Sequence, residues 1–168
     1  MLWVSLVAVF ILVASLLSGL KEGAAKHVAN LVATLIGVYV AGRSYHLVAG
    51  LLHFISSENW QNFLGFFIAL AVSVAILYLV FLAPRKLTEV VWRRGLLSRL
   101  LGGAISVVDA GIGLAVFALV LTAFPVFDWL ARWVGGSGVM ASLVRTFSFV
   151  QQLLPEVFRA AATRILGS

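Results

Sequence analysis

The segment APRKLTEVVWRRGLLSRLLGG, from Ala83 to Gly103, holds five of the chain's twelve lysines and arginines and a single acidic residue, Glu89. Long stretches almost without charge lie on both sides of it. In membrane proteins, lysine and arginine collect in the short loops that stay on the cytoplasmic side. The segment therefore predicts a cytoplasmic basic loop that sets the topology of the chain, with the cations Arg85, Lys86, Arg93, Arg94 and Arg99.

This basic segment is amphipathic if it is helical, with leucine and valine on one face and most of the charges on the other. Such a helix is expected to lie on the inner leaflet of the membrane. Anionic lipid headgroups would attract each cation by about 1 kcal/mol there. A plain topology anchor and a regulatory site for a lipid or a partner both fit this pattern.

The composition excludes an ordinary soluble domain. The chain has 168 residues, of which 62% are hydrophobic and 11% charged, whereas a soluble domain carries about 25% charged residues. There are no cysteines, so disulfides and thiolate chemistry are excluded. The net charge of +6 comes from cations that flank apolar segments, so loop placement explains it better than nucleic-acid binding. We therefore expect an all-α integral membrane protein.

Four segments are apolar enough to cross a bilayer, which takes about 20 residues for a helix. They are 2–20, 24–42, 60–83 and 100–124. Pro84 is expected to end the third helix, because proline disfavours helix in the residue before it. The sequence thus predicts four transmembrane helices.

The second span has an alternative interpretation because Arg43 interrupts its apolar run. We expect the helix to end at Gly42, with the segment 45–55 lying along the far membrane surface. One long tilted helix that runs through Arg43 is the other possibility.

The positions of the cations predict that both termini lie outside the cytoplasm. Lys21 and Lys26 lie between the first two spans, on the same side as the basic segment, and the positive-inside rule places that side in the cytoplasm. The chain then divides into a four-helix transmembrane domain, 1–125, and an amphipathic tail, 126–168. The tail contains amphipathic helices, which are expected to lie at the interface on the outer side of this membrane.

Two intramembrane features are expected to face other helices. The second span has small residues at every fourth position, which allow the close backbone approach that drives association in lipid; this packing stripe is Ala29, Ala33, Gly37 and Ala41. Asp109 is the only acidic residue within a span, and a charge there is costly unless it is protonated or paired. Counting along the helices places three polar residues near one depth, and we expect them to form an intramembrane polar layer: Thr34, Ser73 and Asp109.

Three stretches together resemble the bacterial colicin V production protein (CvpA) family. They are the glycine turn in GLKEGAAKHVANLVATLIG, the helix entry SRLLGGAISVVDAGIG and the serine in GGSGVMASLV, with motif positions Gly19, Gly23, Gly102, Gly103 and Ser137. The chain departs from the family pattern at Met1–Trp3, at Ser106 and at Asp109. The resemblance implies an inner-membrane protein linked to colicin V production or export and to envelope homeostasis. It implies no known reaction.

The sequence shows no pattern for catalysis, a cofactor or a metal. His46 and His53 are seven residues apart and could share a helix face, but two ring nitrogens with no nearby carboxylate make a poor metal site. GGSG does not match the nucleophile elbow of hydrolases. We expect no enzyme. The expected function is an accessory or structural protein that packs with other membrane proteins or with itself. The alternative is a small oligomeric transporter or channel with a polar layer around Asp109. The partner, the oligomeric state and any transported species stay open.

Overall fold

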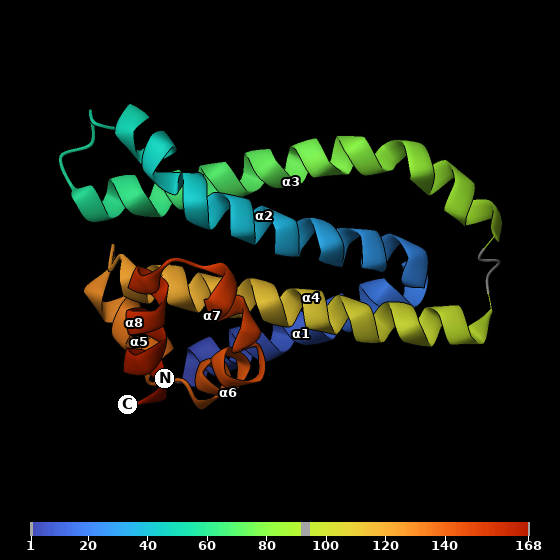
Figure 1. Ribbon diagram of the computed structural model, residues 1–168. Coiled ribbons are helices and arrows are strands. Elements are labelled where there is room, and N and C mark those ends of the chain that lie inside the picture. Colours follow the sequence, from blue (N-terminus) through green and yellow to red (C-terminus); the bar gives the residue numbers. More distant parts are fainter. Residues whose placement is uncertain (1, 92–94, 168) are drawn as a thin grey trace.

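The computed structural model consists of helices joined by short connections (Figure 1). It describes residues 2–91 and 95–167, with the backbone alone at residues 25 and 81–91. Four helices there are long and apolar enough to cross a membrane. Within the described ranges no strand is present, and the helices are α1 (Leu2–Glu22), α2 (Ala24–Leu51), α3 (Glu58–Val91), α4 (Leu96–Ala123), α5 (Asp128–Gly135), α6 (Gly138–Thr146), α7 (Phe149–Leu153) and α8 (Glu156–Leu166).

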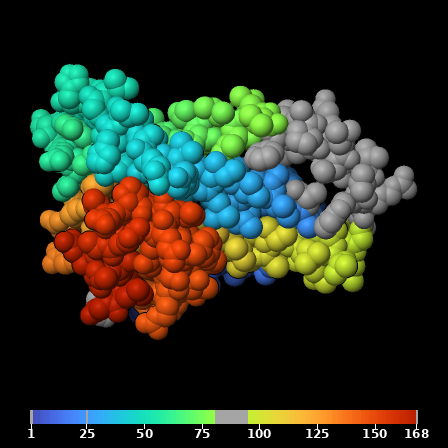
Figure 2. Space-filling view, in the orientation of Figure 1, coloured from blue at the N-terminus to red at the C-terminus, as the bar shows by residue number. Residues whose placement is uncertain are grey.

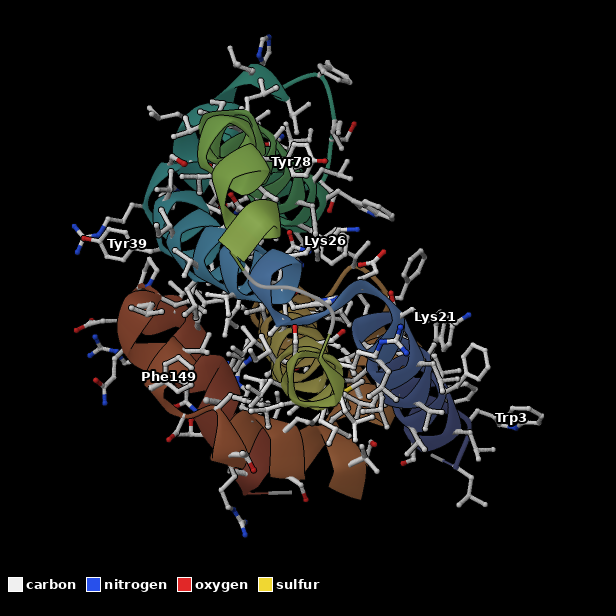
Figure 3. All side chains as sticks on the ribbon, turned by 90° about the vertical axis from the view of Figure 1, so that its right-hand side faces the viewer. Trp3, Lys21, Lys26, Tyr39, Tyr78 and Phe149 are labelled. Carbon is white, nitrogen blue, oxygen red and sulfur yellow. The ribbon has the colours of Figure 1, made fainter. Side chains whose placement is uncertain are left out.

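The four long helices form an open row in the order α3, α2, α4, α1 rather than a closed bundle. The extensive contacts join α2 to α3, α2 to α4, and α1 to α4, and few contacts join α1 to α2 or α3 to α4. The end-on view in Figure 3 shows α3 and α1 at opposite edges of this row, with Trp3 pointing away from the other helices. The two edge helices therefore keep broad apolar faces uncovered by the chain itself.

Glycines bring α2 and α3 into close contact. A Cβ on Gly65 of α3 would lie 2.9 Å from the carbonyl oxygen of Tyr45 and from the backbone nitrogen of Ala49 on α2. From the other side, a Cβ on Gly37 would lie 2.7 Å from Cγ2 of Val74. Neither position accepts a side chain without moving its neighbour, so the glycines set the spacing of the two helices.

The central helix of the fold is α4. Within the 18-residue apolar stretch that could cross a membrane, 56% of the residues of α4 are buried, against 11% of those of α1. The reason is that α5, α6 and α8 also pack on α4, in addition to α1 and α2. On the face shown in Figure 2 these tail helices cover the carboxyl-terminal part of α4, and the amino-terminal part remains visible.

The expected break in the second helix is wrong, because α2 continues without interruption to Leu51. Arg43 lies inside the helix with its guanidinium carbon 4.7 Å above the centre of the Tyr39 ring, one turn earlier. A cation stacked on an aromatic ring can stay at a helix surface without interrupting the helix. Tyr45, expected on the far membrane surface, is instead 1% exposed in the interior.

The expected end of the third helix at Pro84 is also wrong, since α3 runs on to Val91. Strong helix formers such as Lys86 and Leu87 follow the proline, and they continue the helix after the one lost hydrogen bond. At 34 residues, α3 is about 51 Å long and exceeds the roughly 30 Å of hydrocarbon in a bilayer.

The predicted basic loop is consequently shorter than expected. Arg85 and Lys86 belong to α3, and Arg99 belongs to α4, which begins at Leu96. The positions of Arg93 and Arg94 lie outside the described residues. The end of α3, with Arg85 and Lys86, and the start of α4, with Arg99, lie at the same end of the long helices as the turn between α1 and α2 (Figure 1).

The tail and the long helices share one hydrophobic core. Phe158 of α8 is fully buried and packs its ring against those of Tyr45, Phe66 and Phe124 at centroid distances of 5.5–6.0 Å. Further along, the Phe147 ring lies against Gly111, twelve residues before the end of α4 or about 18 Å along the helix. The tail thus lies along the side of α4 as well as beyond its end. The division into a transmembrane domain and an interfacial tail stays a prediction.

Replacing Phe158 with alanine should destabilise the whole fold, because the ring joins α8 to α2, α3 and the end of α4. Large-to-small changes of buried phenylalanine cost about 3–5 kcal/mol. Thermal unfolding of the purified protein in detergent should show a lowered midpoint for Phe158→Ala. The matched control is Phe149→Ala, since that ring is 43% exposed; equal midpoints for the two variants would contradict the shared core.

Candidate functional site

Two helix backbones lie in direct contact where α1 crosses α4. A Cβ on Gly19 would overlap the carbonyl oxygen of Gly102, and a Cβ on Gly102 would lie within 2.5 Å of the carbonyl oxygen of Gly19. On the neighbouring face, a Cβ on Gly103 would lie 3.0 Å from the side chains of Leu16 and Leu20. The glycines of the first and second family stretches therefore meet at one point, backbone against backbone.

Two serines bond the same pair of helices one turn away. The Ser15 and Ser106 hydroxyl oxygens lie 2.7 Å apart, and each lies within hydrogen-bond distance of the other residue's carbonyl oxygen, at 2.9 Å and 2.7 Å, respectively. The two hydroxyl protons can make two of these three bonds at a time. Ser106 is 4% exposed. A hydroxyl pair of this kind joins transmembrane helices where no water competes for the bonds. Ser106, where the family pattern differs, thus has a structural partner that only the fold reveals.

The turn between α1 and α2 also depends on glycine and on α4. Gly23 has a φ of +81°, which side-chain-bearing residues rarely adopt. As the N-cap of α2 it supplies no side-chain hydrogen bond. Ser98 of α4 takes this role, because its Oγ accepts the backbone N–H of Ala24 at 3.4 Å. A helix start is thereby capped from a residue 74 positions away.

Ser137, the last family-motif position, caps a helix as well. Its Oγ accepts the backbone N–H of Met140 at the start of α6, at 3.4 Å, and lies 3.0 Å from Oγ of Ser5 in α1. The side chain is buried, at 2% exposure. These contacts join the start of α1 to the tail.

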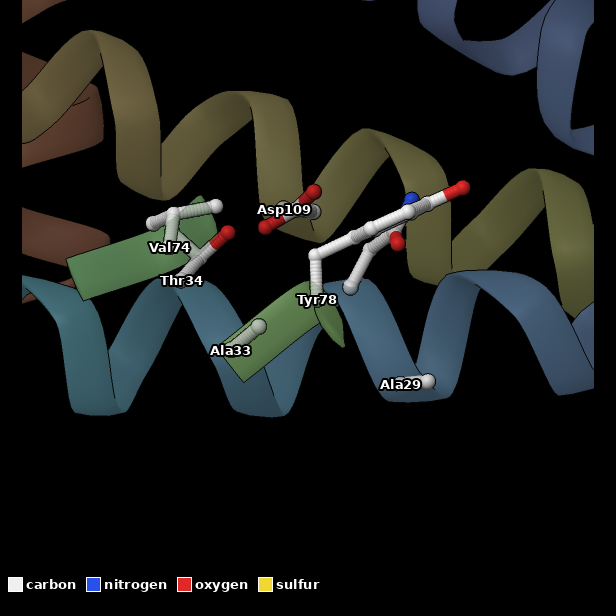
Figure 4. A pocket seen from close by; sticks show the side chains of 7 residues that line it. Ala29, Ala33, Thr34, Val74, Tyr78 and Asp109 are labelled. Atoms are coloured by element: carbon white, nitrogen blue, oxygen red, sulfur yellow. The ribbon is translucent and has the colours of Figure 1, made fainter. Parts of the chain in front are cut away.

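A pocket of about 320 Å³ lies among α2, α3 and α4 (Figure 4). Thr34 and Asp109 of the predicted polar layer both line it, and the Thr34 hydroxyl is a hydrogen-bond partner of the Asp109 carboxyl group. Ser73 does not line it; α3 contributes Val74 and Tyr78 instead. The structure thus brings together two of the three predicted residues. On α3, the residue that follows Ser73 and the residue one turn after it line the pocket.

Two polar residues of the pocket were missed by sequence analysis. Asn30 of α2 and Tyr78 of α3 both line the cavity. The signal for Asn30 was present, because it lies four residues before Thr34 and therefore on the same helix face. Tyr78 carried no such signal, since the pairing of α3 with α2 was needed to place it.

The packing stripe of α2 serves different neighbours along its length. Ala29 and Ala33 line the pocket, Gly37 lies against Val74 of α3, and Ala41 is fully buried in the hydrophobic core. Small size is what these positions share, because each leaves room for a neighbouring helix or for the cavity.

Charged groups gather at the end of the pocket nearest the α1–α2 turn. Glu22 pairs with Lys26 at 2.8 Å, and its other oxygen lies 3.4 Å from Nε2 of His27. His27 is 6% exposed, and it lies close enough to Asp109 for an electrostatic interaction. No group of three metal-ligating side chains occurs among the described residues.

These features define an all-α membrane protein whose helices are joined by glycine and serine contacts. The chain belongs to the colicin V production protein family, whose model matches residues 4–148. No curated protein and no solved structure matches the chain.

Replacing Gly102 with leucine should disrupt folding, because the new side chain would meet the backbone of Gly19, Gly23 and Ala24. Overpacking costs typically about 1–3 kcal/mol, and backbone is the least yielding neighbour. Gly113→Leu in the same helix is the control, since a Cβ there meets nothing within 4 Å. Monodispersity on size-exclusion chromatography and the thermal midpoint should fall for Gly102→Leu alone; a well-folded Gly102→Leu protein would show that the crossing tolerates bulk.

Proposed function

We propose that this chain is an accessory protein of the bacterial cytoplasmic membrane that acts by packing with other membrane proteins or with further copies of itself. The family's description supports a link to colicin V production, and export of the toxin and envelope homeostasis are part of the proposal. We propose no reaction, cofactor or nucleic-acid partner for it.

The open row of helices is the observation that carries this proposal. The edge helices α1 and α3 each pack extensively on a single neighbour among the long helices. Their outer faces present large apolar side chains, with Phe10 72% exposed and Leu79 69% exposed. Lipid covers such faces in an isolated protein, and a partner helix can replace the lipid if shapes match.

We also propose that both termini lie outside the cytoplasm. The cations near the carboxyl end of α3 and the amino end of α4 then face anionic headgroups of the inner leaflet. Lys21 in the last turn of α1 and Lys26 in the first turn of α2 lie at the same end of the molecule as the carboxyl end of α3 and the amino end of α4, which supports placing that end in the cytoplasm (Figure 1).

The topology predicts that a reporter inserted after Arg94 is active only in its cytoplasmic version. The physical reason is the cost of moving a cluster of arginines across the bilayer against the positive-inside bias. Alkaline phosphatase and fluorescent-protein insertions measure the two outcomes. A reporter at the carboxyl terminus is the control and should behave in the opposite way; phosphatase activity after Arg94 would reverse the topology.

A second candidate function is a small oligomeric transporter or channel. The observation that favours it is the pocket with a carboxyl group inside the span region, where ionisable residues often mark substrate or ion pathways. Conduction would need copies of the chain, or a partner, to extend the polar surface across the membrane.

Photo-crosslinking in cells should distinguish the two candidates. A photoreactive amino acid at Phe10 or Leu79 should yield protein adducts of defined mass, because both side chains project from edge helices. The same amino acid at Phe66, which is 0% exposed, should yield none. Lipid adducts alone at Phe10 and Leu79 would contradict packing with partners. Conductance of the purified chain in a defined bilayer would then favour the second candidate.

A further inference from the structure

Two buried polar atoms without a hydrogen-bond partner lie at the end of the molecule that holds the pocket. They are Nε2 of His27 and Oδ1 of Asp109; among the described residues, the remaining atom of this kind is Oγ1 of Thr122, near the far end of α4. Within a membrane, an unsatisfied polar group costs several kcal/mol. Glu22 of the chain itself lies 3.4 Å from Nε2 of His27, whereas no described group hydrogen-bonds to Oδ1 of Asp109, and water is the simplest partner for that oxygen.

The polar groups of α2 form a continuous face that leads to Asp109. His27, Asn30 and Thr34 are spaced three and four residues apart, which places them on one side of the helix. The two outer members are about 10 Å apart along the axis. Asn30 and Thr34 line the pocket, and Thr34 contacts the carboxyl group of Asp109. His27 continues the same face toward the end of the helix.

The polar face reaches the protein surface through Glu22. Its carboxylate oxygen lies 3.4 Å from Nε2 of His27, and its side chain is 38% exposed against 7% for His27. An exposed carboxylate, a buried imidazole and an intramembrane carboxyl group thus follow one another from the surface inward. Series of acidic residues and histidine of this kind form proton relays in membrane proteins.

The pocket has room for the water that such a series needs. Its volume of about 320 Å³ is well above the roughly 30 Å³ that one water occupies in the liquid, so several waters fit. Its polar lining groups come from Asn30, Thr34, Tyr78 and Asp109, which satisfies the requirement of a water for several polar partners.

Beyond Asp109 the same interface becomes apolar and closed. Val38 and Ala41 of α2 are 1% and 0% exposed, and Ile112 and Val116 of α4 are 1% and 2% exposed. Glycine and alanine contacts fill the rest of this region. Water in the pocket therefore has no described route to the other side of the molecule.

We propose that this region is a water-filled half-channel that gives Asp109 access to protons from the side of the α1–α2 turn only. A proton from bulk water binds Glu22 and passes to Nε2 of His27, which makes the ring an imidazolium. The imidazolium releases a ring proton to pocket water and becomes neutral again, and that water protonates Oδ1 of Asp109. Each donor is reprotonated from the side of Glu22. Release follows the same atoms in reverse, so no charge crosses the membrane through this chain alone.

The half-channel goes beyond the packing role proposed above and is independent of it, so an experiment can contradict one without contradicting the other.

The described titratable groups that surround the route are Glu22 of α1, Lys26 and His27 of α2, Tyr78 of α3 and Asp109 of α4. Lys26 is exposed and pairs with Glu22, so it lies at the mouth rather than along the route.

Cysteine accessibility tests the water, because the chain has no cysteine of its own. A charged, membrane-impermeant thiol reagent should label Asn30→Cys and Thr34→Cys in sealed vesicles, since the reactive thiolate forms only in contact with water. The depth-matched controls Val32→Cys and Ile36→Cys, 38% and 40% exposed on the lipid side, should not react. Lys26→Cys identifies the side from which labelling occurs. Reaction of all four variants alike, reaction of none of them, or reaction from the side opposite Lys26→Cys would overturn the half-channel.

Carbodiimide labelling tests the proton, because the reagent reacts with the protonated form of a carboxyl group in an apolar environment. Mass spectrometry should find an adduct at Asp109 that is lost in Asp109→Asn, a change that keeps the side-chain shape. In vesicles with a different pH on each side, labelling should follow the pH on the Lys26 side. His27→Gln should change the pH of half-maximal labelling, and the exposed Lys21→Gln should leave it unchanged. Labelling that follows the other side, that does not depend on pH, or that is identical in His27→Gln would contradict the relay.

Discussion

The backbone contact between Gly19 and Gly102 is the constraint on which the rest of this structure depends. Lipid provides no hydrophobic force that pushes apolar helices together, so association relies on close packing and on a few hydrogen bonds. At this crossing each helix occupies the space that a side chain of the other would need. The paired hydroxyls of Ser15 and Ser106 add polar bonds one turn away. Because α4 also holds α2 and the tail, the crossing positions most of the molecule.

The same crossing positions the polar end of the molecule. Gly23 and Ser98 set the start of α2 beside it, and this start determines which face of α2 meets α4. Asp109 lies seven residues after Gly102, two helical turns further on, so it emerges on nearly the same side of α4 about 10 Å deeper. A packing motif and a line of ionisable groups are thereby linked by helix geometry alone.

The arrangement also explains why a polar pocket can exist in so apolar a chain. A closed bundle would bury every polar group against other side chains, whereas the open row leaves α3 and α4 in little contact and the pocket lies between α2–α3 and α4. The four polar lining residues then share a volume that water can fill. The outer faces of the row remain apolar, as lipid or a partner helix requires.

The sequence by itself determined the class of the protein and the places of its long helices. Low charge, long apolar runs and clustered cations are properties of composition and order, so the four spans follow from them without knowledge of any contact. The family follows from glycines and serines at fixed spacing, and its model matches residues 4–148. Of the polar layer, Thr34 and Asp109 could be paired by counting depth along helices.

Only the structure showed where the helices end, and only the tertiary packing decided which residues meet. The local signals at Arg43 and Pro84 favoured breaks, yet both helices continue, because ring stacking on Tyr39 and the strong helix formers after Pro84 are compatible with helix. The pairing of Ser15 with Ser106, 91 residues apart, depends on how α1 crosses α4, and no local pattern contains that information. The same holds for Tyr78 in the pocket and for Phe158 in the core: both positions depend on the order of helices in the row, which packing determines.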